Sequence, residues 1–93
     1  MCGITGIAVF DEKTTLCRRR LEAMCATLAH RGPDDFGMEI NGKVAMGIRR
    51  LAVIDPPGGK QPMHNEDGSV RTVCNGEIYN FRQLRKNLET WGH

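Results

Sequence analysis

The 93-residue chain has no apolar run near the roughly 18 residues that a membrane-spanning helix requires. Its first ten residues lack the basic start of a secretory signal, and the charged residues Asp11, Glu12 and Lys13 follow directly. These absences predict a cytoplasmic protein without a membrane partner. A net charge of +2 is too small to indicate a nucleic-acid partner either.

The cysteines lack the spacing of a metal site. Cys2, Cys17, Cys25 and Cys74 include no pair separated by two residues, so we expect no bound metal. A reducing cytosol also keeps thiols free. We expect Cys17 and Cys25 to be ordinary residues of a helix and Cys74 to belong to the core. Cys2 differs, because removal of Met1 would give it a free α-amino group beside its thiol.

The rest of the composition, 40% hydrophobic and 26% charged, is that of an ordinary globular chain with one domain at most. A two-residue hairpin turn is predicted at Asn41-Gly42, a helix cap at Asn80 and a helix end at Gly92. A polar loop is predicted over 56–68. Apolar periodicity predicts strands over 3–10, 38–41, 43–48, 50–55 and 70–74, and helices over 16–29 and 81–91.

These segments predict an α+β fold, in which an antiparallel sheet carries helices on one face. The first helix should turn one apolar face to the sheet, formed by Leu21, Met24, Cys25 and Leu28 at helical spacing. An uncovered opposite face would favour self-association.

Three polar loops could join Cys2 in an acyl-transfer site. They are "HRGPDD" (30–35), the "RR" that opens "RRLAVID" (49–55), and "CNGEIYN" (74–80). A thiol with a neighbouring α-amino base is an N-terminal nucleophile, and an Asn amide beside a Gly N–H can stabilise an oxyanion. Successive strand residues face opposite sides, so one of Arg49 and Arg50 points inward, where it could hold a carboxylate. Each loop also has a purely structural interpretation, as a turn, a solvated strand edge or a hairpin turn. In a purely structural domain, Cys2 would be packed and Met1 retained.

Five motifs carry a resemblance to a known family: "MCGI", "HRGPDD", "RRLAVID", "GGKQPM" and "NGEIYNF". Together they resemble the class II glutamine amidotransferase domain of glutamine-hydrolysing asparagine synthases. The resemblance implies an N-terminal nucleophile hydrolase fold, an αββα sandwich of which residues 1–93 are about the first half. "RRLAVID" and "NGEIYN" are the more specific motifs, since "MCGI" also occurs in other class II amidotransferases.

The resemblance also implies catalytic roles. Cys2 attacks the side-chain amide of glutamine and releases ammonia through a γ-glutamyl thioester. Asn75 and Gly76 stabilise the oxyanion. Among the binding residues, Arg50 grips the α-carboxylate of glutamine and Glu77 helps to hold its amino end. The remaining implied contacts come from Val53, through its main chain, and from the loop beside the nucleophile, Arg31 and Gly32.

The implied partners are L-glutamine, the rest of the glutaminase domain and a synthetase domain that binds ATP and magnesium and activates aspartate. No cofactor is expected in this chain. In the family a "Ser/Thr-Asp-x-Glu" motif that binds the substrate amine lies further along, so we expect the 93 residues alone to be inactive. Two alternatives stay open: an asparagine synthase-like enzyme with another amide acceptor, and a non-catalytic interaction fragment.

Overall fold

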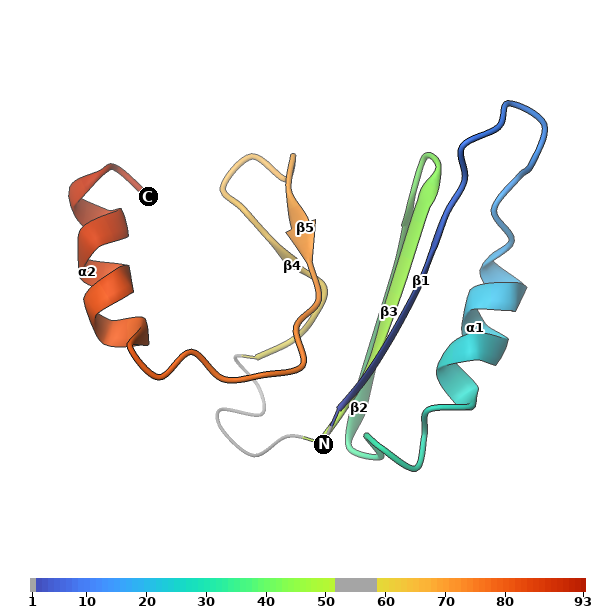
Figure 1. Cartoon of the computed structure of the whole chain (residues 1–93), viewed down its shortest axis with the longest axis horizontal. Helices are drawn as coiled ribbons and strands as arrows, with labels where there is room; N and C mark the ends of the chain where they lie inside the picture. The colour runs from blue at the N-terminus through green and yellow to red at the C-terminus, as the bar shows by residue number, and fades with distance from the viewer. Residues whose placement is uncertain (1, 52–58) are drawn as a thin grey trace.

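The computed structural model of the chain describes residues 2–51 and 59–93. Its secondary structure is mixed, with two helices and two small antiparallel sheets. Helix α1, a three-stranded sheet, a two-stranded hairpin and helix α2 follow one another along the longest dimension, which extends 43 Å (Figure 1). Most of the predicted strand over 50–55 lies outside the described residues.

The three-stranded sheet has the order β1-β3-β2, and all its pairs are antiparallel. Its strands are β1 (Gly3–Ala8), β2 (Asp35–Asn41) and β3 (Val44–Arg50). The register pairs Gly3 with Arg49 at one end of the sheet and Ala8 with Val44 at the other. The sheet therefore brings the start of β1 beside the end of β3.

The hairpin between β2 and β3 is confirmed, but its turn is one residue later than predicted. Asn41 pairs with Val44, so the two turn residues are Gly42 and Lys43 rather than Asn41 and Gly42. Gly42 has a φ of 59°, in the left-handed region that glycine adopts without steric cost. Strand β2 also begins at Asp35 rather than at 38, because Pro33 and Asp34 already run beside Arg50.

Helix α1 (Arg18–Ala26) packs on this sheet through the predicted face. Leu21 and Cys25 are buried against Ala45, and Met24 and Leu28 are half-buried. The helix is shorter than the predicted 16–29. After Ala26 the chain tightens, since the Leu28 N–H bonds the Cys25 carbonyl at 3.0 Å, a three-residue step.

The burial of Cys25 gives a testable prediction. Cys25 is only 4% exposed. This burial raises the pKa of its thiol, and the positive charge of Arg49 offsets part of the rise. Burial limits access to the sulfur, and the raised pKa leaves less of the reactive thiolate, so both should slow alkylation at neutral pH. We expect iodoacetamide to modify the exposed Cys17 and Cys74 rapidly and Cys25 only after denaturation, as peptide mass mapping would show. Equal rates at Cys17 and Cys25 in the native chain would contradict this packing.

The second sheet is the antiparallel hairpin of β4 (Met63–His64) and β5 (Arg71–Thr72). Strand β4 falls within the segment predicted to be loop, and β5 is shorter than the predicted 70–74. The Asn65 side chain closes the turn, since its Oδ1 accepts the Val70 N–H at 3.0 Å. The prediction that Cys74 belongs to the core is wrong, because it follows β5 and is exposed.

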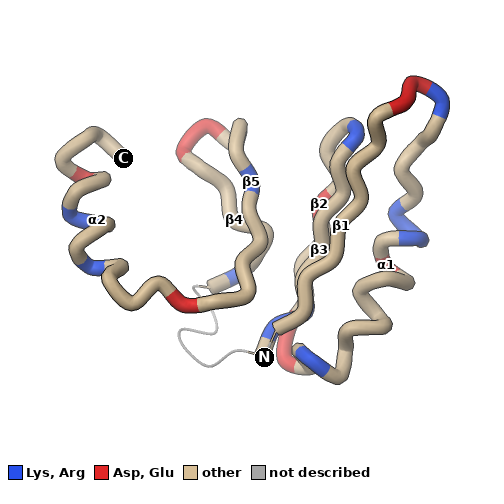
Figure 2. The backbone as a smooth tube through the Cα atoms, viewed as in Figure 1, with Lys and Arg blue, Asp and Glu red and all other residues tan. Residues whose placement is uncertain are grey.

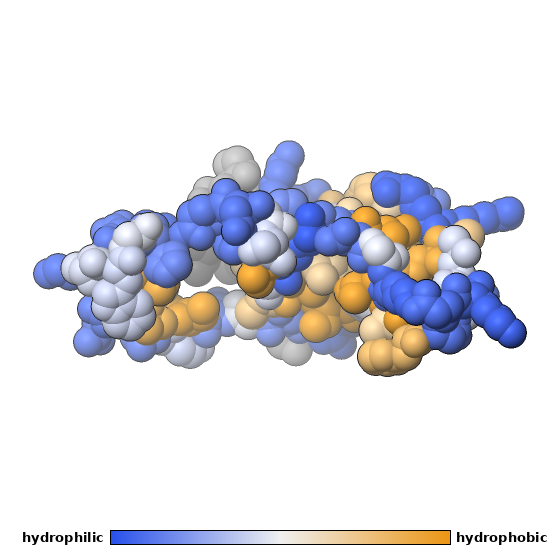
Figure 3. All heavy atoms as spheres, turned by 90° about the horizontal axis from the view of Figure 1, so that it is seen from above, coloured by the Kyte–Doolittle hydropathy of each residue, from blue (hydrophilic) through white to orange (hydrophobic). Residues whose placement is uncertain are grey.

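Helix α2 (Phe81–Thr90) lies beyond the hairpin and packs against no other helix or strand in the described part of the chain. The prediction of both helices on one face is therefore wrong for α2. Asn80 occupies the N-cap position, but its side chain makes no capping bond to any described residue, whereas Gly92 ends the helix with a φ of 95°. Hydrophobic surface is visible in the space-filling view (Figure 3). The exposed large apolar residues of α2 are Phe81, Leu84 and Leu88, and Trp91 at its C-cap is exposed as well.

Charged residues are spread over the molecule. Lys and Arg lie on both helices and at the N-terminal end of the sheet, with acidic residues between them (Figure 2). Neither of the two helices in the described ranges has the length and apolar composition needed to cross a membrane.

Candidate functional site

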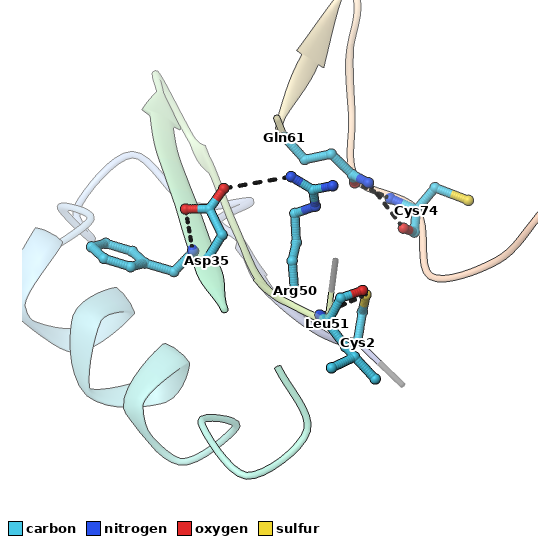
Figure 4. Close-up of polar contacts among 7 residues, drawn as sticks. Cys2, Asp35, Arg50, Leu51, Gln61 and Cys74 are labelled. Atoms are coloured by element: carbon cyan, nitrogen blue, oxygen red, sulfur yellow. Dashed lines mark hydrogen bonds and ion pairs between the residues drawn. The ribbon is translucent and has the colours of Figure 1, made fainter. Parts of the chain in front are cut away.

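The candidate site lies at the end of the three-stranded sheet where Cys2 precedes β1 and Arg50 ends β3 (Figure 4). Because Gly3 pairs with Arg49, the antiparallel register brings Cys2, just before β1, close to Arg50 at the end of β3. Residues 48 positions apart in the sequence therefore lie at the same end of the sheet. Met1 lies outside the described residues.

The thiol of Cys2 is positioned by the main chain of Leu51. The Leu51 N–H donates a hydrogen bond to Cys2 Sγ at 3.4 Å. The Cys2 thiol in turn donates to the Leu51 carbonyl oxygen, with a distance of 3.9 Å from Sγ to the oxygen. Sequence reasoning missed Leu51, and no residue-type signal could have found it, because any residue except proline supplies the same N–H.

Two predicted site residues converge on the carbonyl oxygen of Cys2. Arg31 Nε donates to it at 3.2 Å, and Asn75 Nδ2 donates to it at 3.0 Å. The structure thus places both residues against the predicted nucleophile, although Asn75 is 73 positions away in the sequence. The Asn75 amide carries a second N–H, which this bond leaves available for another acceptor.

Gly32 lies buried against the end of β3. A Cβ at this position would overlap the main chain at Arg49 and Arg50, so no larger residue fits without moving the strand. The Gly32 carbonyl oxygen accepts a hydrogen bond from Arg49 Nε at 3.0 Å. Gly32 is therefore a packing residue for the strand that presents Arg50.

The alternation expected for the arginine pair is confirmed, and Arg50 is the inward member. It is 6% exposed, and its Nη1 lies 3.4 Å from Asp35 Oδ2. Arg49 lies on the opposite side, over the Phe36 ring at 5.6 Å. Asp35 belongs to the "HRGPDD" motif, but pairing it with Arg50 required the three-dimensional structure.

Cys2 and Arg50 line a common cavity of about 530 Å³. The guanidinium of Arg50 points away from the thiol, toward Asp35 and Gln61 (Figure 4). The predicted residues Asn75, Gly76 and Glu77 also line this cavity and are exposed, while Val53 lies outside the described residues. The other lining residues are Leu51, Gly59, Gln61, Met63, Cys74 and Tyr79.

Comparison with known proteins matches the sequence to a family. Residues 1–93 match a family model described as a glutamine amidotransferase domain. The chain belongs to this family.

The amidotransferase chain is also similar to plant enzymes named asparagine synthetase [glutamine-hydrolyzing]. It is 41% identical to the one from Sandersonia aurantiaca over 88 residues, which covers 95% of the chain and 17% of that relative. It is 43% identical to asparagine synthetase 1 of Arabidopsis thaliana over 89 residues, which covers 96% of the chain and 15% of that relative. The chain thus spans about one sixth of the length of these relatives.

Gln61 is a further site residue of the amidotransferase chain that sequence reasoning missed. Its Oε1 accepts the Cys74 N–H at 2.7 Å, and its Nε2 donates to the Cys74 carbonyl oxygen at 3.3 Å (Figure 4). One side-chain amide therefore satisfies both main-chain groups of the residue before Asn75. The "GGKQPM" motif contains Gln61, so a polar side chain in a predicted loop was the available signal.

The amidotransferase cavity combines a thiol, amide donors and a buried cation in a volume suited to a small molecule. Arg50 can still bind a carboxylate, since its guanidinium has more N–H groups than the Asp35 pair uses. Across residues 2–51 and 59–93, no three His, Cys, Asp or Glu side chains gather in a way that could hold a metal ion.

Proposed function

We propose that this amidotransferase chain hydrolyses glutamine to glutamate and ammonia. The single observation that carries the proposal is one cavity lined by the Cys2 thiol, the Asn75–Gly76 donors and the buried Arg50. A nucleophile, an oxyanion site and a carboxylate clamp are the parts that amide hydrolysis by covalent catalysis needs. The names of the relatives support glutamine as the substrate.

The proposed reaction begins when removal of Met1 leaves Cys2 with a free α-amino group. That amine, directly or through water, takes the thiol proton, and the sulfur attacks the side-chain carbonyl carbon of glutamine. The C–N bond breaks, and the nitrogen takes the proton and leaves as ammonia. Water then attacks the γ-glutamyl thioester, which releases glutamate and returns a proton to the Cys2 sulfur.

The other site residues hold and polarise the substrate in this proposal. The second N–H of Asn75 and the Gly76 N–H stabilise the oxyanion, and Leu51 orients the sulfur through its N–H. Arg50 binds the α-carboxylate of glutamine at the end of the cavity away from the thiol. Glu77, an exposed carboxylate on the cavity wall, holds the amino end.

We further propose that the ammonia serves ATP-dependent synthesis of asparagine from aspartate, as the names of the relatives suggest. ATP and magnesium would bind to a synthetase domain, and no residue of this chain is assigned to them. The proposed fold of the complete glutaminase domain is the αββα sandwich of N-terminal nucleophile hydrolases. The sequence of layers along the chain's long axis, helix, sheet, hairpin and helix, supports that fold (Figure 1).

The 93-residue polypeptide by itself should not turn over glutamine, because Asn75, Gly76 and Glu77 are exposed and helix α2 packs on no described element. The rate measurements proposed here therefore apply to these residues within a complete glutaminase domain. Two alternatives make different predictions. A related enzyme with another acceptor would keep the same glutaminase chemistry. A non-catalytic interaction fragment would bind a partner without any reaction at Cys2.

The decisive experiment is intact-mass measurement before and after treatment with 6-diazo-5-oxo-L-norleucine, an electrophilic glutamine analogue. In a complete glutaminase domain we expect loss of Met1 and a single adduct at Cys2 that excess glutamine suppresses, because the cavity holds the analogue beside the thiol. The 93 residues alone should lose Met1 without forming the adduct. The control is Cys17→Ala, which removes an exposed thiol outside the cavity and should leave the adduct unchanged. Retained Met1, or labelling of Cys17 as fast as Cys2, would contradict the proposal.

A further inference from the structure

We propose that Glu39 is a positioning residue that docks the β4–β5 hairpin onto the three-stranded sheet and thereby sets the position of Asn75 and Gly76. The part of this inference that concerns catalysis rests on the proposed function. The docking itself stands on the geometry alone.

One carboxylate bridges both strands of the hairpin. Glu39 projects from β2, its Oε1 lies 2.6 Å from Arg71 Nε, and its Oε2 lies 2.9 Å from His64 Nε2. His64 and Arg71 are directly paired across β4 and β5. Because the two oxygens bind opposite strands, Glu39 holds the hairpin as a unit rather than at one point.

The Glu39 bridge matters because little else joins the two sheets. Among the described residues, neither β4 nor β5 pairs with a strand of the three-stranded sheet. Besides the Glu39 bridge, the segment that leads into β4 contacts β2 at Gly37. Gly37 lies two residues before Glu39 and therefore on the same face of β2. A Cβ at Gly37 would overlap the Gln61 carbonyl oxygen, so the hairpin approaches this face closely.

A continuous set of contacts leads from this face to the candidate site. Gly37 contacts Gln61, the Gln61 side chain bonds both main-chain groups of Cys74, and the next residue, Asn75, bonds the Cys2 carbonyl. A hairpin that moves away from β2 therefore carries Asn75 and Gly76 with it. Arg50 would stay in place because it belongs to the three-stranded sheet, and so would Cys2, which directly precedes strand β1 of that sheet.

The ionisation of Glu39 is consistent with this role. Its hydrogen bond with His64, together with the hydrogen bond and charge of Arg71, lowers the pKa of the carboxyl below its usual value of 4.5. The Glu39 side chain is 23% exposed. The Glu66 side chain, which forms a comparable pair with His93, is 59% exposed. Glu39 thus remains charged and partly shielded from solvent near neutral pH.

The test compares Glu39→Gln with Glu12→Gln. Glu12→Gln removes a carboxylate from the exposed pair with Lys43, which makes no contact with the β4–β5 hairpin through that carboxylate. We expect Glu39→Gln to raise amide hydrogen exchange over 71–77 about tenfold and to lower kcat for glutamine about tenfold, as loss of a charge-assisted bond would. KM should change little, because Arg50 does not move. The reversed pair Glu39→Arg with Arg71→Glu should restore both quantities in part, because it re-forms the ion pair between β2 and β5 but leaves His64 without its carboxylate partner.

Exchange over 71–77 and a kcat equal to those of Glu12→Gln would overturn the inference, and so would failure of the reversed pair to rescue. If Glu39→Gln does not unfold cooperatively, Arg71→Gln makes the same test from the hairpin side. If the unaltered complete domain neither hydrolyses glutamine nor labels at Cys2, the proposed function fails, whereas the exchange measurement still decides the role of Glu39.

Discussion

Replacing Cys2 by alanine is expected to abolish glutamine hydrolysis while leaving the fold intact. Loss of the nucleophile from a covalent mechanism removes about a millionfold in kcat in a well-studied acyl-transfer enzyme. The side chain contributes little to folding, because its contacts are the weak sulfur bonds to Leu51. Glutamate release, measured with purified Cys2→Ala, should fall to the background, with an unfolding midpoint close to that of the unaltered chain.

The matched control is Cys17→Ala, which makes the same substitution at an exposed position outside the cavity. Its glutaminase rate should equal that of the unaltered chain. Glutamate release by Cys2→Ala above one hundredth of that rate would remove Cys2 from the mechanism. A large fall in the unfolding midpoint would instead show that Cys2 has a structural role.

Replacing Arg50 by alanine should raise the KM for glutamine strongly. A buried carboxylate that loses a charge-assisted hydrogen-bonded partner is destabilised by about 1.5–3 kcal/mol, which corresponds to roughly a 10- to 150-fold rise in KM. The kcat should fall less, because the guanidinium points away from the thiol (Figure 4). Steady-state kinetics with glutamine would separate the two effects.

Arg50 is also paired with Asp35 and buried, so its removal can lower stability as well. Arg50→Lys retains the charge but not the two-pronged geometry, and should give an intermediate KM in a folded chain. Arg18→Ala is the matched control, because it removes an exposed arginine from a pair with Glu22 on α1. An unchanged KM in a folded Arg50→Ala chain would rule out Arg50 as the clamp.

Local patterns predicted the elements whose stability depends on near neighbours. Periodicity placed β1, the β2–β3 hairpin and both helices, and it identified the face of α1 that buries Leu21 and Cys25. Alternation along an extended strand was enough to require one buried arginine near 49–50, and Arg50 is that residue. These predictions succeed because side-chain direction within one element follows from its own geometry.

The errors concern contacts between distant segments. Strand β4 was missed because two residues in a polar loop become a strand only by pairing with β5. Leu51 and Gln61 were missed because they act through the main chain, either by providing an N–H or by binding one. The bridge from Glu39 to His64 and Arg71 links residues 25 and 32 positions apart, which no short-range pattern encodes.

The antiparallel register also determines where the protein can be altered safely. The Gly42-Lys43 turn joins β2 and β3 at the end of the sheet opposite Cys2 and Arg50, and β3 spans seven residues, or roughly 20 Å. Within the described residues, the turn has one side-chain partner, the exposed Glu12, and the pair of Glu12 with Lys43 contributes little to stability. An affinity tag or spectroscopic label inserted at this turn would leave the α-amino group of Cys2 free, whereas a tag fused before Met1 would block it.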